Sequence, residues 1–75
     1  MQIREGEFAK TTKPVLLVEI SWDPDFHVVE HAEIPAGTTV QVESVHNAGF
    51  RGIEAFVRLP GTRLTNHVHI EDLVK

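Results

Sequence analysis

The chain has 75 residues, of which 41% are hydrophobic and 24% charged, values that exclude intrinsic disorder and a coiled coil. This length suffices for one hydrophobic core and excludes a second domain. The absence of cysteine excludes disulfides and thiolate zinc sites, and the net charge of −4 argues against general affinity for phosphate backbones.

The first residues predict an arm and no targeting segment. Apolar residues follow no sustained period over residues 1–13, so we expect a polar N-terminal arm that is loosely held or docked on a neighbour. The longest uninterrupted apolar run, Val15 to Val18, is far shorter than the roughly 20 residues that span a bilayer. No signal-peptide region is visible, so we expect a cytoplasmic protein with no membrane partner.

A single domain is predicted over residues 14–75, and its first strand covers 15–22. This segment is rich in β-branched residues, and it is apolar on one side throughout and on the other side in its first half. One side of the extended chain carries Leu16, Val18, Ile20 and Trp22. The other side begins with Val15 and Leu17, which the arm, another strand or another subunit would have to cover.

Turn residues divide the rest of the domain into four further strands. Pro24 and its flanking aspartates end the first strand, and a second extended piece follows over 26–34. The segment 34–37 predicts a type I turn, and 38–45 a strand whose apolar alternation slips phase, as at a β-bulge.

The C-terminal half repeats this pattern. A glycine-containing loop over 46–52 precedes a strand over 53–59, in which Ile53, Ala55, Val57 and Leu59 alternate with polar or aromatic residues. Pro60 and Gly61 occupy the central positions of a type II turn. A last strand over 65–70 and a short tail complete the chain.

Five short strands in a meander this small hide their edges by curling into a barrel. The layout of residues 14–75 resembles the SH3-like barrels, which implies an all-β, five-stranded antiparallel barrel. The run Ile34-Pro35-Ala36-Gly37-Thr38-Thr39-Val40 and the ending Val68-His69-Ile70-Glu71-Asp72-Leu73 are also similar to small barrel proteins of phages and mobile elements. That second likeness implies no function.

Two aromatic residues flank two carboxylates in the segment 22–26. In one interpretation Trp22 and Phe26 plug the mouth of the barrel while Asp23 and Asp25 cap the turn. In the other, the four side chains form an exposed patch that binds a basic protein partner. Phe56, on the outward side of its strand, is a further candidate for contact with a partner or with another copy of the chain.

The five histidines raise the question of a metal. His67 and His69 would project from one side of an extended segment with Glu71 next in line, a spacing compatible with zinc or nickel. The favoured interpretation makes them polar residues on the solvent side, opposite Val68 and Ile70. We therefore expect no metal and no cofactor.

Arginines gather where the chain is least acidic. Residues 46–70 contain three arginines and one glutamate, whereas residues 1–45 contain three basic and eight acidic residues. Arg51, Arg58 and Arg63, with Phe50 and Phe56 nearby, could contact phosphates and bases. Nucleic-acid binding is thus the alternative function, and it depends on whether these arginines converge on one face.

Signals for catalysis or for proline-rich peptides are missing. The chain has no cysteine nucleophile, no phosphate-binding glycine loop and no Gly-x-Ser-x-Gly motif, so we do not expect an enzyme. SH3 domains that bind peptides line their groove with tyrosines, and this chain has none. Small plasmid-borne dihydrofolate reductases of similar layout carry Val-Gln-Ile-Tyr where this chain has Val68-His69-Ile70-Glu71. The sequence favours an interaction or self-assembly module that acts on a protein partner or on its own copies.

Overall fold

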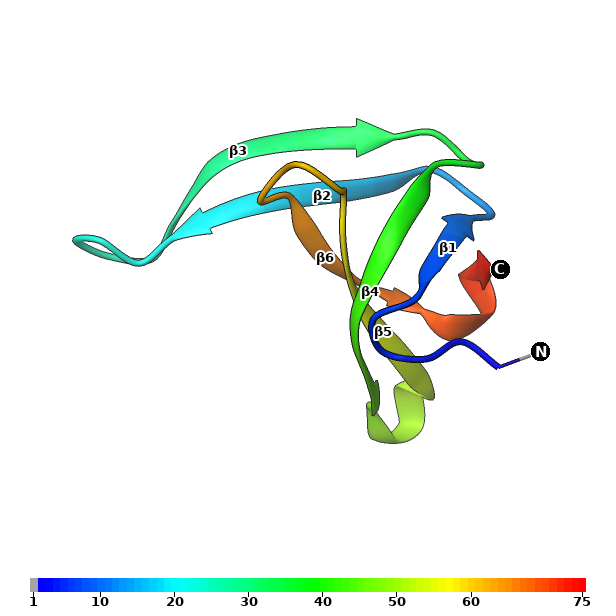
Figure 1. Ribbon diagram of the computed structural model, residues 1–75. Coiled ribbons are helices and arrows are strands. Elements are labelled where there is room, and N and C mark those ends of the chain that lie inside the picture. The colour runs from blue at the N-terminus through cyan, green and yellow to red at the C-terminus, as the bar shows by residue number, and fades with distance from the viewer. Residues whose placement is uncertain (1) are drawn as a thin grey trace.

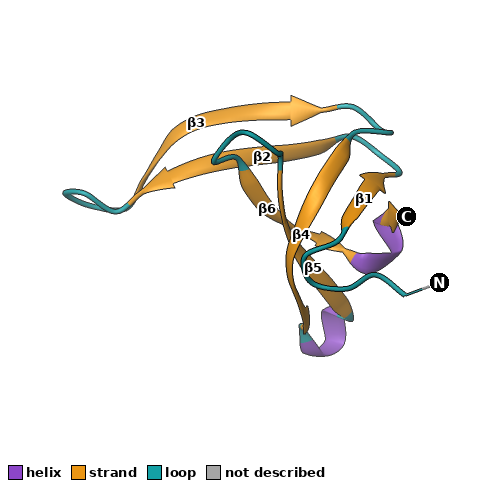
Figure 2. Ribbon diagram, in the orientation of Figure 1, coloured by secondary structure: helices purple, strands orange, loops and turns teal. Residues whose placement is uncertain are grey.

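The computed structural model describes residues 2–75; Met1, the first residue of the predicted arm, lies outside them. The described chain is all-β and forms one curled antiparallel sheet, with two short 3-10 turns and no α-helix (Figures 1 and 2). Residues 2–75 contain seven strands: β1 Phe8–Thr11, β2 Val15–Ser21, β3 His27–Ile34, β4 Thr39–Asn47, β5 Ile53–Arg58, β6 Thr65–His69 and β7 Leu73–Val74. The 3-10 turns are η1 Gly49–Arg51 and η2 Ile70–Asp72.

The expected count of five strands is therefore wrong, although all five predicted strands are present. The two additional strands are β1, within the predicted arm, and β7, within the predicted tail. β1 pairs with β4 on one side and with β7 on the other. Ile3, Ala9 and Thr11 are buried, so this segment belongs to the fold, and short stretches with few apolar residues still pair when each contributes one or two to the core.

The strand order β3-β2-β6-β5-β4-β1-β7 makes β3 and β7 the edges of the sheet within the described chain. β4, β5 and β6 pair along most of their length. β2 joins this curled body at a single register pair, Val18 with Thr65. The β2–β3 hairpin consequently projects away from the rest of the molecule (Figure 1).

The core lies on the inner side of the curl. Leu17, Val40, Val42, Ala55 and Val57 are fully buried. Complete burial of an aliphatic side chain contributes about 1.5–3 kcal/mol, so these positions dominate the stability. The predicted inward residues of β5 are confirmed for Ala55 and Val57, whereas Ile53 is 41% exposed at the end of the strand.

The orientation of β2 differs from the expected one. Val15 and Leu17 face the core, where the Ile34 side chain and others pack against them, whereas Leu16 is 48% exposed. Residues 15–18 are apolar on both sides, so their pattern does not specify which side is buried. Pairing with β6 and β3 settles the orientation.

Two of the predicted turn features are confirmed. The N–H of Thr62 donates to the carbonyl of Leu59 at 3.1 Å, and Gly61 has φ +80°, as a type II turn requires. The phase slip in β4 is a bulge between Val42 and Ser44. The turn expected at 34–37 lies one residue later, because Gly37 takes φ +86° and its N–H donates to the carbonyl of Thr11, 2.7 Å away.

Over residues 2–75, no helix has the length and apolar character needed to cross a membrane.

Candidate functional site

The β2–β3 hairpin carries most of the exposed large apolar side chains. The two strands pair from Val15 and Ile34 to Ser21 and His27, and Val29 is the extra residue of a bulge in β3. The exposed apolar residues on the hairpin and its tip are Leu16, Ile20, Trp22, Phe26, Val28 and Val29. Such a concentration on one projecting element is typical of an interaction surface.

The hairpin is also strongly acidic. It carries Glu19, Asp23, Asp25, Glu30 and Glu33, and the sequence has no lysine or arginine between residues 14 and 50. Glu19 and Glu30 are register partners on adjacent strands, so their side chains lie on the same side of the ribbon. Like charges directly opposite each other destabilise a strand pair, which a cationic partner would relieve.

Four of the five predicted partner-binding residues lie together at the hairpin tip. The rings of Trp22 and Phe26 contact each other with centroids 4.8 Å apart, and they are 74% and 56% exposed. The backbone N–H of Asp23 donates to Ser21 Oγ at 3.3 Å, and the Asp25 carbonyl lies 2.7 Å from His27 Nδ1. These local hydrogen bonds leave both aspartate side chains exposed beside the rings.

The interpretation in which Trp22 and Phe26 plug the barrel mouth is therefore wrong. A side chain that plugs a core has to lie over it, and the tip lies at the far end of the projecting hairpin (Figure 1). The valines, leucines and isoleucines of the inner side fill the core without them. Both rings instead lie exposed at the tip, and the binding of a basic partner there stays a prediction.

Phe56, the fifth predicted residue, lies elsewhere. It is half-buried on the outer side of β5, where its ring packs 4.8 Å from that of His67 on β6. The His67 ring meets His46 of β4 edge-on at 5.2 Å, and His46 Nε2 lies 3.7 Å from the buried Glu54 carboxylate. Phe56 thus belongs to an outer-face cluster of the body and not to the tip.

The histidines that raised the metal hypothesis do not assemble a site. His67 and His69 are on β6, whereas Glu71 is in η2, where the chain has left the strand. Across residues 2–75 no three histidine, aspartate or glutamate side chains are grouped so that they could hold a metal ion.

The three arginines of the nucleic-acid alternative do not converge. Arg58 is engaged with Glu43 Oε1, Gln41 Oε1 and the Thr62 carbonyl. Arg51 is in η1 before β5, and Arg63 follows β5 at its other end. At about 3.3 Å per residue, the six residues of β5 separate those ends by roughly 17 Å. Phe50 is fully exposed beside Arg51, but no second aromatic lies next to it.

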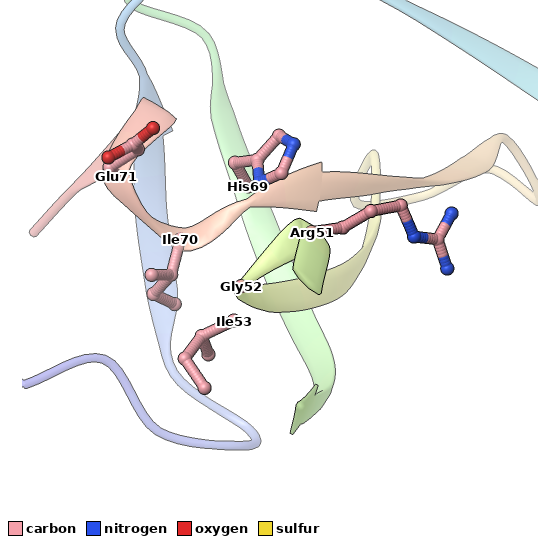
Figure 3. A pocket seen from close by; sticks show the side chains of 6 residues that line it. All are labelled: Arg51, Gly52, Ile53, His69, Ile70 and Glu71. Atoms are coloured by element: carbon pink, nitrogen blue, oxygen red, sulfur yellow. The ribbon is translucent and has the colours of Figure 1, made fainter. Parts of the chain in front are cut away.

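A small pocket lies where η1 and the start of β5 meet the end of β6. Its volume is about 120 Å³, and Ile53, His69, Ile70 and Glu71 line it (Figure 3). Arg51 and Gly52 complete its lining (Figure 3). The volume is well below the roughly 300–1,000 Å³ of typical small-molecule sites.

Sequence reasoning missed the exposed aliphatic residues of the hairpin. The sequence placed Leu16 and Ile20 on the same side as Trp22. It gave no prediction for Val28 and Val29. The available signal was a segment, residues 15–18, that is apolar on both sides, since one of the two sides stays uncovered unless both faces of the sheet pack against other elements.

Comparison with protein-family models, curated proteins and solved structures finds no match to this chain.

Proposed function

We propose that this chain is a non-enzymatic protein-interaction module that binds a basic protein surface through the tip of its β2–β3 hairpin. The observation that carries the proposal is the contact pair of Trp22 and Phe26, exposed beside two carboxylates at the end of a projecting element. Aromatic side chains are enriched among the residues that dominate binding energy at interfaces.

The charge distribution supports a basic partner. The hairpin contains five carboxylates and no lysine or arginine, whereas the rest of the chain has seven basic and six acidic residues. Asp23 and Asp25 lie between Trp22 and Phe26 in the sequence, so a lysine or arginine of the partner would meet a carboxylate while its aliphatic stem covers a ring. Complementary charge of this kind accelerates association and selects the partner.

The remaining features are consistent with a binding role. The pocket near His69 is too small to enclose a typical substrate. The curled antiparallel sheet, in which β4, β5 and β6 are consecutive neighbours and β6 pairs with the β2–β3 hairpin, supports an SH3-like assignment, which we retain as part of this proposal.

Site-specific photo-crosslinking from the tip tests the proposal. A benzoylphenylalanine residue replaces Trp22 in the full chain, and crosslinked products are collected from the cells that naturally produce the protein. We expect a discrete protein adduct whose yield falls at least tenfold when Asp23 and Asp25 are both replaced by asparagine.

The same photoreactive residue at Phe50 is the matched control, because Phe50 is fully exposed in η1, and this segment lies away from the hairpin tip (Figures 1 and 2). The proposal fails if position 50 yields the same adducts as position 22. It also fails if the aspartate replacements leave the yield unchanged.

A further inference from the structure

We propose that two copies of this chain associate through the outer face of the β2–β3 hairpin, the side opposite the core. This surface is distinct from the tip, so the inference goes beyond the proposed function. The side chains that form the outer face of the hairpin are Leu16, Val18 and Ile20 of β2 and Val28, His31 and Glu33 of β3.

The strand register defines this face. Val15 and Leu17 are buried against the core, so the alternate residues of β2 point outward. Register partners share a side of the ribbon, and Val28 is the partner of Ile20. The fractions of Leu16, Ile20 and Val28 that remain exposed are 48%, 38% and 50%.

The hairpin has little support of its own. Beyond the Val18–Thr65 pair, the distal half of β2 has only β3 beside it, and β3 is an edge strand. An isolated two-stranded ribbon is marginally stable in water, and it gains stability when one face packs on another layer. Covering the outer face would both remove apolar surface from water and fix the projecting ribbon.

Charge identifies the second copy as the occupant. A two-fold contact places the same surface on both sides, so it must tolerate meeting itself. The outer face contains a single carboxylate, Glu33, while Glu19 and Glu30 point to the opposite side. Two outer faces can therefore pack together without burying opposed carboxylates, and a basic partner would find few charges there.

The surface needed for a stable dimer is larger than these three side chains. A standard interface buries about 800 Å² on each partner, so the contact has to extend beyond Leu16, Ile20 and Val28. The outer face continues onto β6, where Thr65 is the register partner of Val18. Thr65 and His67 of β6 and Phe56 of β5 extend the same side of the sheet.

Sedimentation equilibrium of the full chain over a range of concentrations tests the inference. We expect the wild-type protein to reach twice the mass of one chain. The double variant Ile20→Thr with Val28→Thr keeps β-branched side chains in both strands, so the hairpin should still form. Its dimer dissociation constant should rise at least tenfold.

Two controls make the result specific. Ile53 is 41% exposed, close to the 38% of Ile20, but it lies at the other end of the body. The variant Ile53→Thr should therefore leave the dimer dissociation constant unchanged. Trp22→Ser with Phe26→Ser alters the tip and should also leave the dimer intact. An unchanged circular dichroism spectrum in each variant confirms the fold.

The inference is overturned if the wild-type chain remains a monomer up to about 1 mM. It is also overturned if the tip variant loses the dimer while the outer-face variant keeps it. A monomer that still gives the Trp22 crosslink would remove this inference and leave the proposed function standing. A dimer that gives no Trp22 crosslink would remove the proposed function and leave this inference standing.

Discussion

Arg58 of β5 forms hydrogen bonds with three residues, two on β4 and one in the turn that follows β5. Its Nε donates to Glu43 Oε1 at the bulge of β4, its Nη2 to Gln41 Oε1 at 2.7 Å, and its Nη1 to the Thr62 carbonyl at 3.3 Å. The planar guanidinium offers donors in several fixed directions, which an ammonium group cannot reproduce. The side chain is 31% exposed, so water weakens but does not abolish these interactions.

Replacement of Arg58 should therefore destabilise the protein moderately. We expect Arg58→Ala to lower the free energy of unfolding by about 1–2 kcal/mol, because hydrogen bonds to three partners are lost at a partly exposed site. Arg58→Lys should recover only part of this loss. Urea denaturation followed by circular dichroism measures both effects.

Arg63→Ala is the control, since Arg63 is an exposed arginine only five residues away. Surface replacements of this kind usually change stability by less than about 0.5 kcal/mol. Equal effects of Arg58→Ala and Arg63→Ala would show that the hydrogen bonds of Arg58 contribute nothing to stability.

The tip residues illustrate what can be predicted for single side chains. The sequence placed Trp22, Asp23, Asp25 and Phe26 at a turn, because proline and aspartate favour turns, and this was correct. It could not decide between a buried and an exposed aromatic pair. That choice depends on how far the hairpin extends from the body, which is a tertiary property.

Among the elements, β2 has the least expected arrangement. Leu16 and Leu17 are adjacent residues of the same type, yet Leu17 is fully buried and Leu16 is 48% exposed. A one-residue change of register would exchange the two sides of the strand.

This pair provides a direct test of the orientation of β2. We expect Leu17→Ala to lower the free energy of unfolding by about 2–5 kcal/mol through the cavity that it creates. Leu16→Ala should cost less than about 1 kcal/mol in dilute protein, where the chain is monomeric. Thermal or urea denaturation of both variants measures these changes. A larger loss of unfolding free energy for Leu16→Ala than for Leu17→Ala would mean that the opposite side of β2 faces the core.

Strand positions were predictable in this chain because turn residues separate them clearly. Pro24, Gly37, Gly52 and Pro60 separate the predicted strands, whose bounds lie within one or two residues of the observed bounds of β2 to β6. β1 and β7 were missed because four and two residues are too short for a periodic signal. They exist because the body offers them partners, which the local sequence does not reveal.

At the scale of the whole molecule, contacts between the first and last strands complete the sheet. The N–H of Thr12 donates to the Asp72 carbonyl at 2.9 Å, and Lys13 Nζ lies 3.0 Å from the Asp72 carboxylate. Lys75 Nζ lies 2.9 Å from Glu7 Oε2. These contacts attach β7 to the segment that carries β1.

The contact of Lys75 predicts a pH dependence of stability. A hydrogen bond from the Lys75 ammonium, with a second from the backbone N–H of Arg4, holds the pKa of Glu7 below its usual value of 4.5. A carboxyl whose pKa is lower in the folded state stabilises the fold above its unfolded-state pKa. This contribution is lost as the pH falls through the folded-state pKa.

Comparison of the wild-type chain with Glu7→Gln isolates this effect. The difference in unfolding free energy between them should be largest near pH 7 and should shrink as the pH falls below about 4.5. Denaturant titrations at several pH values measure it. A difference that stays constant down to pH 2.5 would contradict the assignment to Glu7.

The absence of lysine and arginine from the hairpin also determines which reagents can detect it. Trypsin cleaves after lysine and arginine, and the sequence offers neither from residue 14 to residue 50, so limited digestion with trypsin leaves the whole hairpin in one peptide. Amine-reactive crosslinkers and labels have no lysine there either. Chymotrypsin, in contrast, has Trp22 and Phe26 exposed at the tip, so protection of these two sites from cleavage would report directly that the tip is occupied.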